Sequence, residues 1–280
     1  MATTEAVKQR TLLGECSAEF AGTFILILFG VGVVAQVVAG GIGDHDSISW
    51  AWGIGVIMGV YVSARLSGGH INPAVTIALA VFRGFAWRKV LPYIGAQFLG
   101  AFAAALVVRW NYDKVLDKFD PGLTIKSQGV FSTLPGNGST ELGAGMWSGF
   151  LDQIIGTAIL MLVILAIVDL RNTAPAANLG PFIIGLLVVG IGMAWGTLAG
   201  YAINPARDFG PRLASYLTGY GGAFKDQFGD PYFWVPIVGP IIGALVGALL
   251  YDLLVGRYLP VGDADEEPGR VPEPEEETRA

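Results

Sequence analysis

Six long apolar segments constrain the fold of this chain more than any other feature of its sequence. A bilayer is crossed by an α-helix of roughly 20 apolar residues, and segments close to that length cover about 13–39, 48–66, 90–110, 147–168, 179–199 and 232–255. Of the 280 residues, 53% are hydrophobic and 14% are charged, whereas soluble domains carry about 25% charged residues. The sequence therefore predicts an all-α integral membrane protein.

Two short stretches interrupt the apolar pattern. They read SGGHINPAV at 67–75 and GYAINPARD at 200–208, and each carries Asn-Pro-Ala behind glycine. The two asparagines, Asn72 and Asn204, are 132 positions apart. Asparagine is a favoured N-cap, and proline suits the first helical position because its missing N–H has no intrahelical partner there. Each stretch is therefore predicted to begin a half-helix too short to span the membrane.

The two halves of the chain repeat the same order of elements. Glu19 stands near the start of the first span, before Gly22-Thr23, and Asp152 stands near the start of the fourth span, before Gly156-Thr157. Each half contains three predicted spans. An odd number of spans places the second half in the membrane upside down, which is the inverted-repeat plan of many transport proteins.

The stretches before the two asparagines are predicted to line a pore. Backbone that is not helical cannot face lipid, because its N–H and C=O groups would lie unpaired. The candidate pore-lining carbonyls belong to Gly68, Gly69, His70, Gly200, Tyr201 and Ala202. In an inverted repeat, the positive ends of the half-helices and the amides of Asn72 and Asn204 point at one central constriction. A neutral solute with lone pairs passes there, and a cation is repelled.

The paired Asn-Pro-Ala stretches at this spacing resemble the aquaporin (major intrinsic protein) family over about residues 13–258. The run at 208–211 and the long loops at 111–146 and 218–231 are similar to its glycerol-conducting branch, the aquaglyceroporins and bacterial glycerol facilitators. The resemblance implies six transmembrane helices, two re-entrant half-helices and a homotetramer. It also implies a passive channel for glycerol and other small uncharged solutes, with urea, other polyols and some water among them, that excludes protons and ions.

The resemblance further implies a selectivity filter outside the asparagine pair, formed by Trp52, Gly192, Tyr201 and Arg207. Trp52 and Tyr201 would form an apolar corner for a carbon backbone, and Arg207 would donate to hydroxyl groups. Gly192 would widen the ring where water channels typically carry histidine. Tyr201 departs from the phenylalanine of bacterial glycerol facilitators, which leaves the preference between water and glycerol open.

Three carboxylates, Glu19, Asp152 and Asp208, are expected to brace the loops. By resemblance, Glu19 and Asp152 accept hydrogen bonds from the re-entrant stretches, although Asp152 is one methylene shorter than the glutamate that the family has there. Asp208 is expected to pair with neighbouring donors. The alternative for Glu19 and Asp152 is a proton relay, since ionisable groups inside a membrane are often functional.

Other classes of function fit parts of the sequence. Gly192 and Asp208 argue against a strict water channel. A proton- or sodium-coupled carrier would use Glu19 or Asp152 as its coupling site. An intramembrane enzyme is disfavoured because the spans contain no evident nucleophile–base pair. Cys16 is the only cysteine, so no cysteine cluster can bind zinc. We expect no enzymatic activity, no cofactor and no metal.

The chain is divided into three predicted parts: a cytoplasmic segment (1–12), a channel domain (13–258, with repeats at about 13–110 and 147–258) and a disordered acidic cytoplasmic tail (259–280). The tail's net charge of −6 equals that of the whole chain, so the rest is neutral and offers no nucleic-acid footprint. One side of the predicted topology carries Lys8, Arg10, Arg65, Arg83, Arg88, Lys89, Arg171 and Arg257. The positive-inside rule then places both termini in the cytoplasm of a multi-pass plasma-membrane protein.

Overall fold

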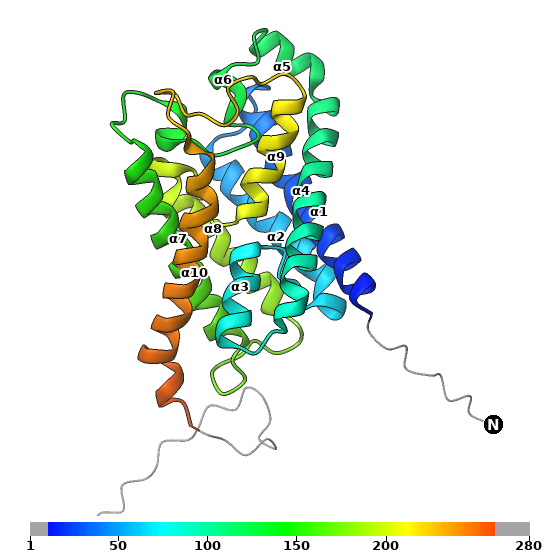
Figure 1. Cartoon of the computed structure of the whole chain (residues 1–280), viewed down its shortest axis with the longest axis vertical. Coiled ribbons are helices and arrows are strands. Elements are labelled where there is room, and N and C mark those ends of the chain that lie inside the picture. Colours follow the sequence, from blue (N-terminus) through cyan, green and yellow to red (C-terminus); the bar gives the residue numbers. More distant parts are fainter. Residues whose placement is uncertain (1–10, 261–280) are drawn as a thin grey trace, which may run out of the picture.

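The computed structural model describes residues 11–260, and every regular element in that range is a helix (Figure 1). Six helical segments within it are long and apolar enough to cross a membrane. They are α1 (Leu12–Val38), α2 (His45–Ser67), α4 (Trp87–Asn111), α7 (Met146–Val168), α8 (Gly180–Ala199) and α10 (Val235–Leu254), the last flanked by η2 (Tyr232–Trp234) and η3 (Gly256–Tyr258). The predicted all-α membrane architecture is confirmed. Most of the predicted N-terminal segment and acidic tail, residues 1–10 and 261–280, lies outside the described residues.

The start of α2 differs from the sequence-based expectation because of its N-cap. The helix begins at His45, three residues before the predicted position. The Asp44 side chain accepts a hydrogen bond from the Ser47 backbone N–H at 2.8 Å, and the Ser47 hydroxyl in turn accepts from the Asp44 N–H at 3.2 Å. This reciprocal capping box satisfies two backbone donors that a helix start leaves unpaired. Polar residues thus extend the helix beyond its apolar segment.

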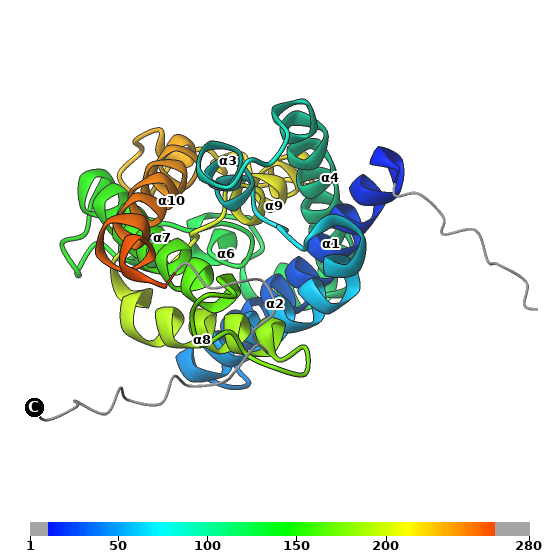
Figure 2. The same cartoon turned by 90° about the horizontal axis from the view of Figure 1, so that it is seen from below.

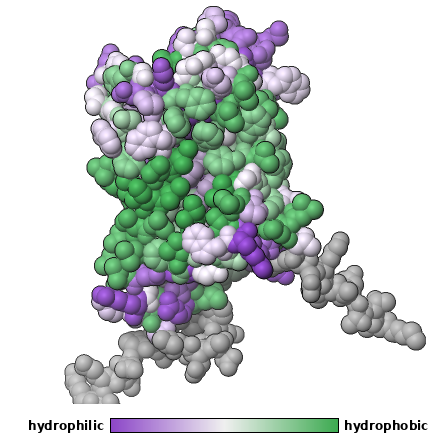
Figure 3. All heavy atoms as spheres, viewed as in Figure 1, coloured by the Kyte–Doolittle hydropathy of each residue, from purple (hydrophilic) through white to green (hydrophobic). Residues whose placement is uncertain are grey.

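The surface of the molecule has the polarity expected of a membrane-spanning bundle. On the face shown in Figure 3, hydrophobic side chains form a broad green belt across the middle, and polar side chains gather at the two ends. Seen along the helices, α1, α2, α8, α7 and α10 follow one another around the rim (Figure 2). The belt lies where lipid tails would contact the helices.

Two half-helices, α3 (Pro73–Phe82) and α9 (Pro205–Leu217), complete the bundle. They lie in opposite halves of the molecule, α9 above and α3 below (Figure 1). Asn72 and Asn204 are their N-caps, and the proline after each asparagine is the first helical residue. The predicted half-helices are therefore present and start where the Asn-Pro chemistry favours a start.

Glycines bring the closing span of each repeat against the opening span. A Cβ atom on Gly100 of α4 would lie 2.4 Å from the Phe20 carbonyl oxygen of α1. A Cβ on Gly247 of α10 would lie 2.2 Å from the Ala158 carbonyl oxygen of α7. Such distances are too short for any side chain, so these glycines allow the close helix crossings typical of membrane bundles.

The long connection between α4 and α7 contains three short helices, α5 (Asp113–Phe119), α6 (Ile125–Gln128) and η1 (Pro135–Gly138). It covers the end of the molecule from which α9 enters (Figure 1). The Ser127 and Tyr220 hydroxyl oxygens are 2.9 Å apart and join this connection to the loop after α9. Residues of the connection therefore reach the second half-helix.

Candidate functional site

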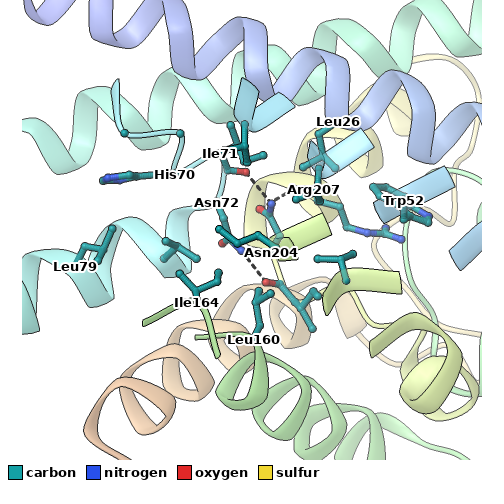
Figure 4. A pocket seen from close by; sticks show the side chains of 18 of the residues that line it. Leu26, Trp52, His70, Ile71, Asn72, Leu79, Leu160, Ile164, Asn204 and Arg207 are labelled. Carbon is teal, nitrogen blue, oxygen red and sulfur yellow. Dashed lines mark hydrogen bonds between the residues drawn. The ribbon is translucent and has the colours of Figure 1, made fainter. Parts of the chain in front are cut away.

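The two re-entrant stretches are joined by a reciprocal pair of hydrogen bonds. The Asn72 amide nitrogen donates to the Ile203 carbonyl at 2.8 Å, and the Asn204 amide nitrogen donates to the Ile71 carbonyl at 2.8 Å (Figure 4). Each asparagine thus bonds the residue that precedes the other. The side-chain oxygens of both asparagines accept from the first turns of their own half-helices. The N-termini of α3 and α9 are consequently held together inside the bundle.

The backbone before each asparagine adopts an unusual conformation. Ile71 has φ +42°, Tyr201 has φ +36° and Ile203 has φ +46°. Positive φ is rare for any residue with a Cβ and is an outlier for a β-branched one, and each case costs about 1–3 kcal/mol. The Ile71 and Ile203 carbonyls were not among the six predicted from glycine content. An isoleucine directly before Asn-Pro-Ala in both repeats was the signal that could have identified them.

Glu19 holds the first re-entrant stretch from α1. Its carboxylate is fully buried and accepts the backbone N–H groups of His70 at 2.9 Å and Ile71 at 2.7 Å. The Ser67 hydroxyl and the Gln97 amide donate to it at 2.6 and 2.7 Å. Four donors therefore compensate the cost of burying this charge, which would otherwise be high.

The second re-entrant stretch is held by Gln153 and not by Asp152, so the expectation for Asp152 is wrong. The Gln153 side-chain oxygen accepts from the Ile203 N–H at 2.8 Å, and its amide nitrogen donates to the Ala199 carbonyl at 3.0 Å. Asp152 is buried, with 4% of its surface exposed, and its Oδ2 atom has no hydrogen-bond partner among the described residues. A side-chain amide can both donate and accept, and Gln153 does both when it holds the second re-entrant stretch.

Helix periodicity explains the difference between Asp152 and Gln153. Glu19 precedes the Gly-Thr pair of its repeat by three positions, and Gln153 does the same, whereas Asp152 precedes it by four. One position on an α-helix turns a side chain by about 100°. The Asp152 side chain therefore does not point toward the re-entrant stretch, whereas the Gln153 side chain does. Counting from the glycine would have identified Gln153.

Replacing Gln153 by methionine is expected to destabilise the protein, whereas replacing Asp152 by leucine is not. The first change leaves the Ile203 N–H and the Ala199 carbonyl without their side-chain partner, at about 1–3 kcal/mol for each buried group. The second removes a buried carboxylate and replaces it by an apolar group of similar shape. Thermal unfolding of both variants in detergent, followed by tryptophan fluorescence, measures the difference. A larger drop in melting temperature for Asp152→Leu than for Gln153→Met would contradict the conclusion that Gln153 holds the second re-entrant stretch.

Two cavities meet inside the molecule. The larger has a volume of about 360 Å³ and is lined by both asparagines and by aliphatic side chains such as Leu26, Leu160 and Ile164 (Figure 4). The smaller, of about 230 Å³, opens beside the α4–α7 connection. The residues proposed to contribute carbonyls line the larger cavity (Gly68, Gly69, His70, Tyr201, Ala202) or the smaller one (Gly200, Tyr201).

Trp52, Tyr201 and Arg207 line both cavities and so mark their junction. The Arg207 guanidinium carbon lies 4.0 Å from the centroid of the Trp52 ring, in cation–π geometry (Figure 4). Gly192 lies behind Tyr201: a Cβ on this glycine would be 2.8 Å from the Tyr201 Cζ atom. The space that Gly192 leaves is therefore filled by the tyrosine ring. The sequence, in contrast, predicts that this space widens the opening.

Asp208 fastens α9 to the α4–α7 connection. Its carboxylate accepts from the Thr133 backbone N–H and hydroxyl, both at 2.7 Å, and from the Arg212 Nε at 2.7 Å. Arg212 also donates to the Thr133 and Ala223 carbonyls at 2.8 and 2.6 Å. Both charged side chains are fully buried. Sequence reasoning missed Arg212, although an acid and a base four positions apart on one helix are natural partners.

A metal centre is not evident in the described part of the chain. Within residues 11–260, no three His, Cys, Asp or Glu side chains are grouped so that they could hold an ion. His70 instead packs its ring against Phe85, with centroids 4.7 Å apart, and its Nδ1 atom lies 3.2 Å from the Thr76 hydroxyl. The expected absence of a metal, a cofactor and an enzymatic activity stays a prediction.

The bundle of membrane-spanning helices, with two half-helices that meet beside internal cavities, defines a multi-pass membrane channel. More specifically, this chain belongs to the major intrinsic protein family. The sequence pattern of that family, described as Major intrinsic protein, matches residues 6–251.

Among its relatives, the chain is 46% identical over 280 aligned positions to the glycerol uptake facilitator protein of Pseudomonas aeruginosa, covering 96% of this chain and 99% of that protein. It is 47% identical over 247 positions to the probable aquaglyceroporin-2 of Gibberella zeae, covering 85% and 71% of the two chains. The X-ray structure of the aquaglyceroporin from Plasmodium falciparum superposes with a TM-score of 0.79 at 33% identity, covering 89% of this chain and 99% of that one.

Proposed function

We propose that this protein is a passive, bidirectional channel for glycerol and similar small uncharged solutes, with some permeability to water. The observation that carries this proposal is the junction of the two cavities, where the Arg207 guanidinium packs against the Trp52 ring and Tyr201 lines the same space. A polyol has a hydroxyl-bearing side and a carbon side, and this junction offers donors to one and aromatic surface to the other. The glycerol uptake facilitator among the relatives supports the same class of solute.

The proposal assigns the filter to Trp52, Gly192, Tyr201 and Arg207, and the central constriction to Asn72 and Asn204. Each asparagine amide has two N–H groups; one bonds the opposite stretch, and the second donates to a passing hydroxyl. The positive ends of both half-helices face the same place and repel cations. Glu19, Gln153 and Asp208 keep these groups in position through the bonds described above.

We further propose that both termini lie in the cytoplasm of a homotetrameric plasma-membrane protein with the domain limits expected from the sequence. The predicted cytoplasmic end holds two linked ion pairs, Arg83–Asp252 and Arg171–Asp169, and the Tyr251 hydroxyl donates to Asp169 at 2.8 Å. The hydrogen bond from Arg171 lowers the pKa of Asp169 to about 2, so the pair stays charged at neutral pH. This distribution of basic residues supports the orientation.

Stopped-flow light scattering on proteoliposomes tests the proposed function. After an inward glycerol gradient is applied, vesicles that contain the protein are expected to shrink and then re-swell faster than protein-free vesicles, because glycerol enters through the channel. A sucrose gradient on the same vesicles measures water flow alone.

Two results would contradict the proposal. Water flow without glycerol re-swelling indicates a strict water channel. Glycerol entry that depends on an imposed pH gradient indicates a coupled carrier, since a passive pore responds only to the gradient of its own solute.

A further inference from the structure

We propose that His45 is a positioning residue that sets the solute selectivity of the filter, an inference that rests on the proposed function. His45 is the first residue of α2. It lines the smaller cavity together with Trp52, Tyr201 and Arg207, so it stands at the mouth of the proposed filter.

His45 contacts the filter through a hydrogen bond. Its Nε2 atom lies 2.9 Å from the Gly192 carbonyl oxygen. A carbonyl can only accept, so Nε2 carries the hydrogen and donates. The bond joins two residues that are 147 positions apart. It therefore ties the start of α2 to the turn of α8 that lies behind Tyr201.

The imidazole ring also contacts Tyr201 directly. The two ring centroids are 6.4 Å apart and the ring planes cross at 87°, an edge-to-face arrangement. A Cβ on Gly196, one turn beyond Gly192, would lie 2.3 Å from the His45 Cε1 atom. The bare backbone of α8 thus accommodates His45 at Gly196 and Tyr201 at Gly192.

The α4–α7 connection also contacts this face of α8. The Asn137 amide nitrogen donates to the Gly196 carbonyl at 3.0 Å, and Asn137 also lines the smaller cavity. The carbonyls of Gly192 and Gly196 are therefore each held by a side chain from outside the helix. Tyr201 lies between this fixed helix face and the imidazole edge, so the position of His45 determines how far the tyrosine ring stands into the opening.

This arrangement separates two contributions of His45, the hydrogen bond to Gly192 and the ring contact with Tyr201. The His45→Phe variant keeps an aromatic edge but cannot donate. The His45→Gln variant keeps an amide donor of similar reach but has no ring. The hydrogen bond has the dominant role, because it joins a side chain of α2 directly to the Gly192 carbonyl behind the tyrosine.

The test compares re-swelling rates for glycerol and for the five-carbon polyol xylitol in the same proteoliposome preparation. The ratio of the two rates does not depend on how much protein folds or inserts. His45→Phe is expected to lower the glycerol-to-xylitol ratio by about three- to tenfold, the effect of one neutral hydrogen bond on a barrier. His45→Gln is expected to restore the ratio. Asp46→Asn, at an exposed neighbour on the same helical turn, serves as the control.

The outcomes separate this inference from the proposed function. No glycerol re-swelling by the unaltered protein overturns the proposed function itself. Normal re-swelling with an unchanged ratio in His45→Phe overturns the role of His45 alone. If His45→Phe lowers the glycerol-to-xylitol ratio and His45→Gln does not restore it, the hydrogen bond is not the contact through which His45 acts.

Discussion

Replacing Gly192 by alanine is expected to lower glycerol conduction by roughly 5- to 150-fold and to lower water conduction less. The new methyl group would lie 2.8 Å from the Tyr201 Cζ atom and 2.9 Å from the Ser49 hydroxyl oxygen. Overpacking of this kind costs about 1–3 kcal/mol, which as a barrier corresponds to that range of rates. We expect the methyl group to push the Tyr201 ring into the opening, which obstructs glycerol more than the smaller water molecule.

Gly190→Ala provides the matched control, because a Cβ at that position on the same helix has no neighbouring atom within 4 Å. Gly192→His adds a whole ring at the same place and is expected to have the larger effect. Stopped-flow glycerol and water permeabilities of the three variants are compared with those of the unaltered protein. An equal loss of both permeabilities in Gly192→Ala tells against the assigned filter.

Replacing Arg212 by methionine is expected to prevent most of the protein from folding. Arg212 is fully buried and donates to the Asp208 carboxylate and to the Thr133 and Ala223 carbonyls. Removing one partner of a buried ion pair costs about 3–5 kcal/mol, because the other charge stays buried without compensation. That is a large part of the roughly 5–15 kcal/mol that stabilises a typical protein. The yield of monodisperse protein in detergent and its melting temperature measure the effect.

The double variant Arg212→Met with Asp208→Leu is expected to recover part of this loss. It removes both charges, and apolar residues often replace a buried ion pair at little cost. Arg88→Met, at an exposed arginine, is the control for the loss of a positive charge. A normal yield from Arg212→Met alone would show that this ion pair does not hold α9 to the long connection.

Local sequence patterns predicted most of the fold. The six spans follow from apolar length, and the starts of α3 and α9 at Pro73 and Pro205 follow from the capping chemistry of asparagine and proline. Among the six spans, the largest differences lie at the ends of helices, as at His45, where a polar cap extends α2 beyond its apolar segment. These features depend on residues close in the chain, so the sequence is sufficient to predict them.

The candidate site was predicted less completely. The choice of Asp152 in place of Gln153 was an error of helical register, which counting from Gly156 would have avoided. The filter and constriction roles stay proposals. For Gly192, the sequence indicated open space, and only the packing of Tyr201 against it shows how that space is filled.

The sequence by itself determined that this chain is a membrane-embedded inverted repeat with a half-helix beginning at each Asn-Pro-Ala, because span length and capping are local properties and the order of the repeated elements is read directly along the chain. Only the tertiary structure decided which groups meet. Asn72 bonds Ile203 across 131 positions, and His45 bonds Gly192 across 147. No pattern within either segment specifies such partners, because they are brought together only when the two repeats pack against each other.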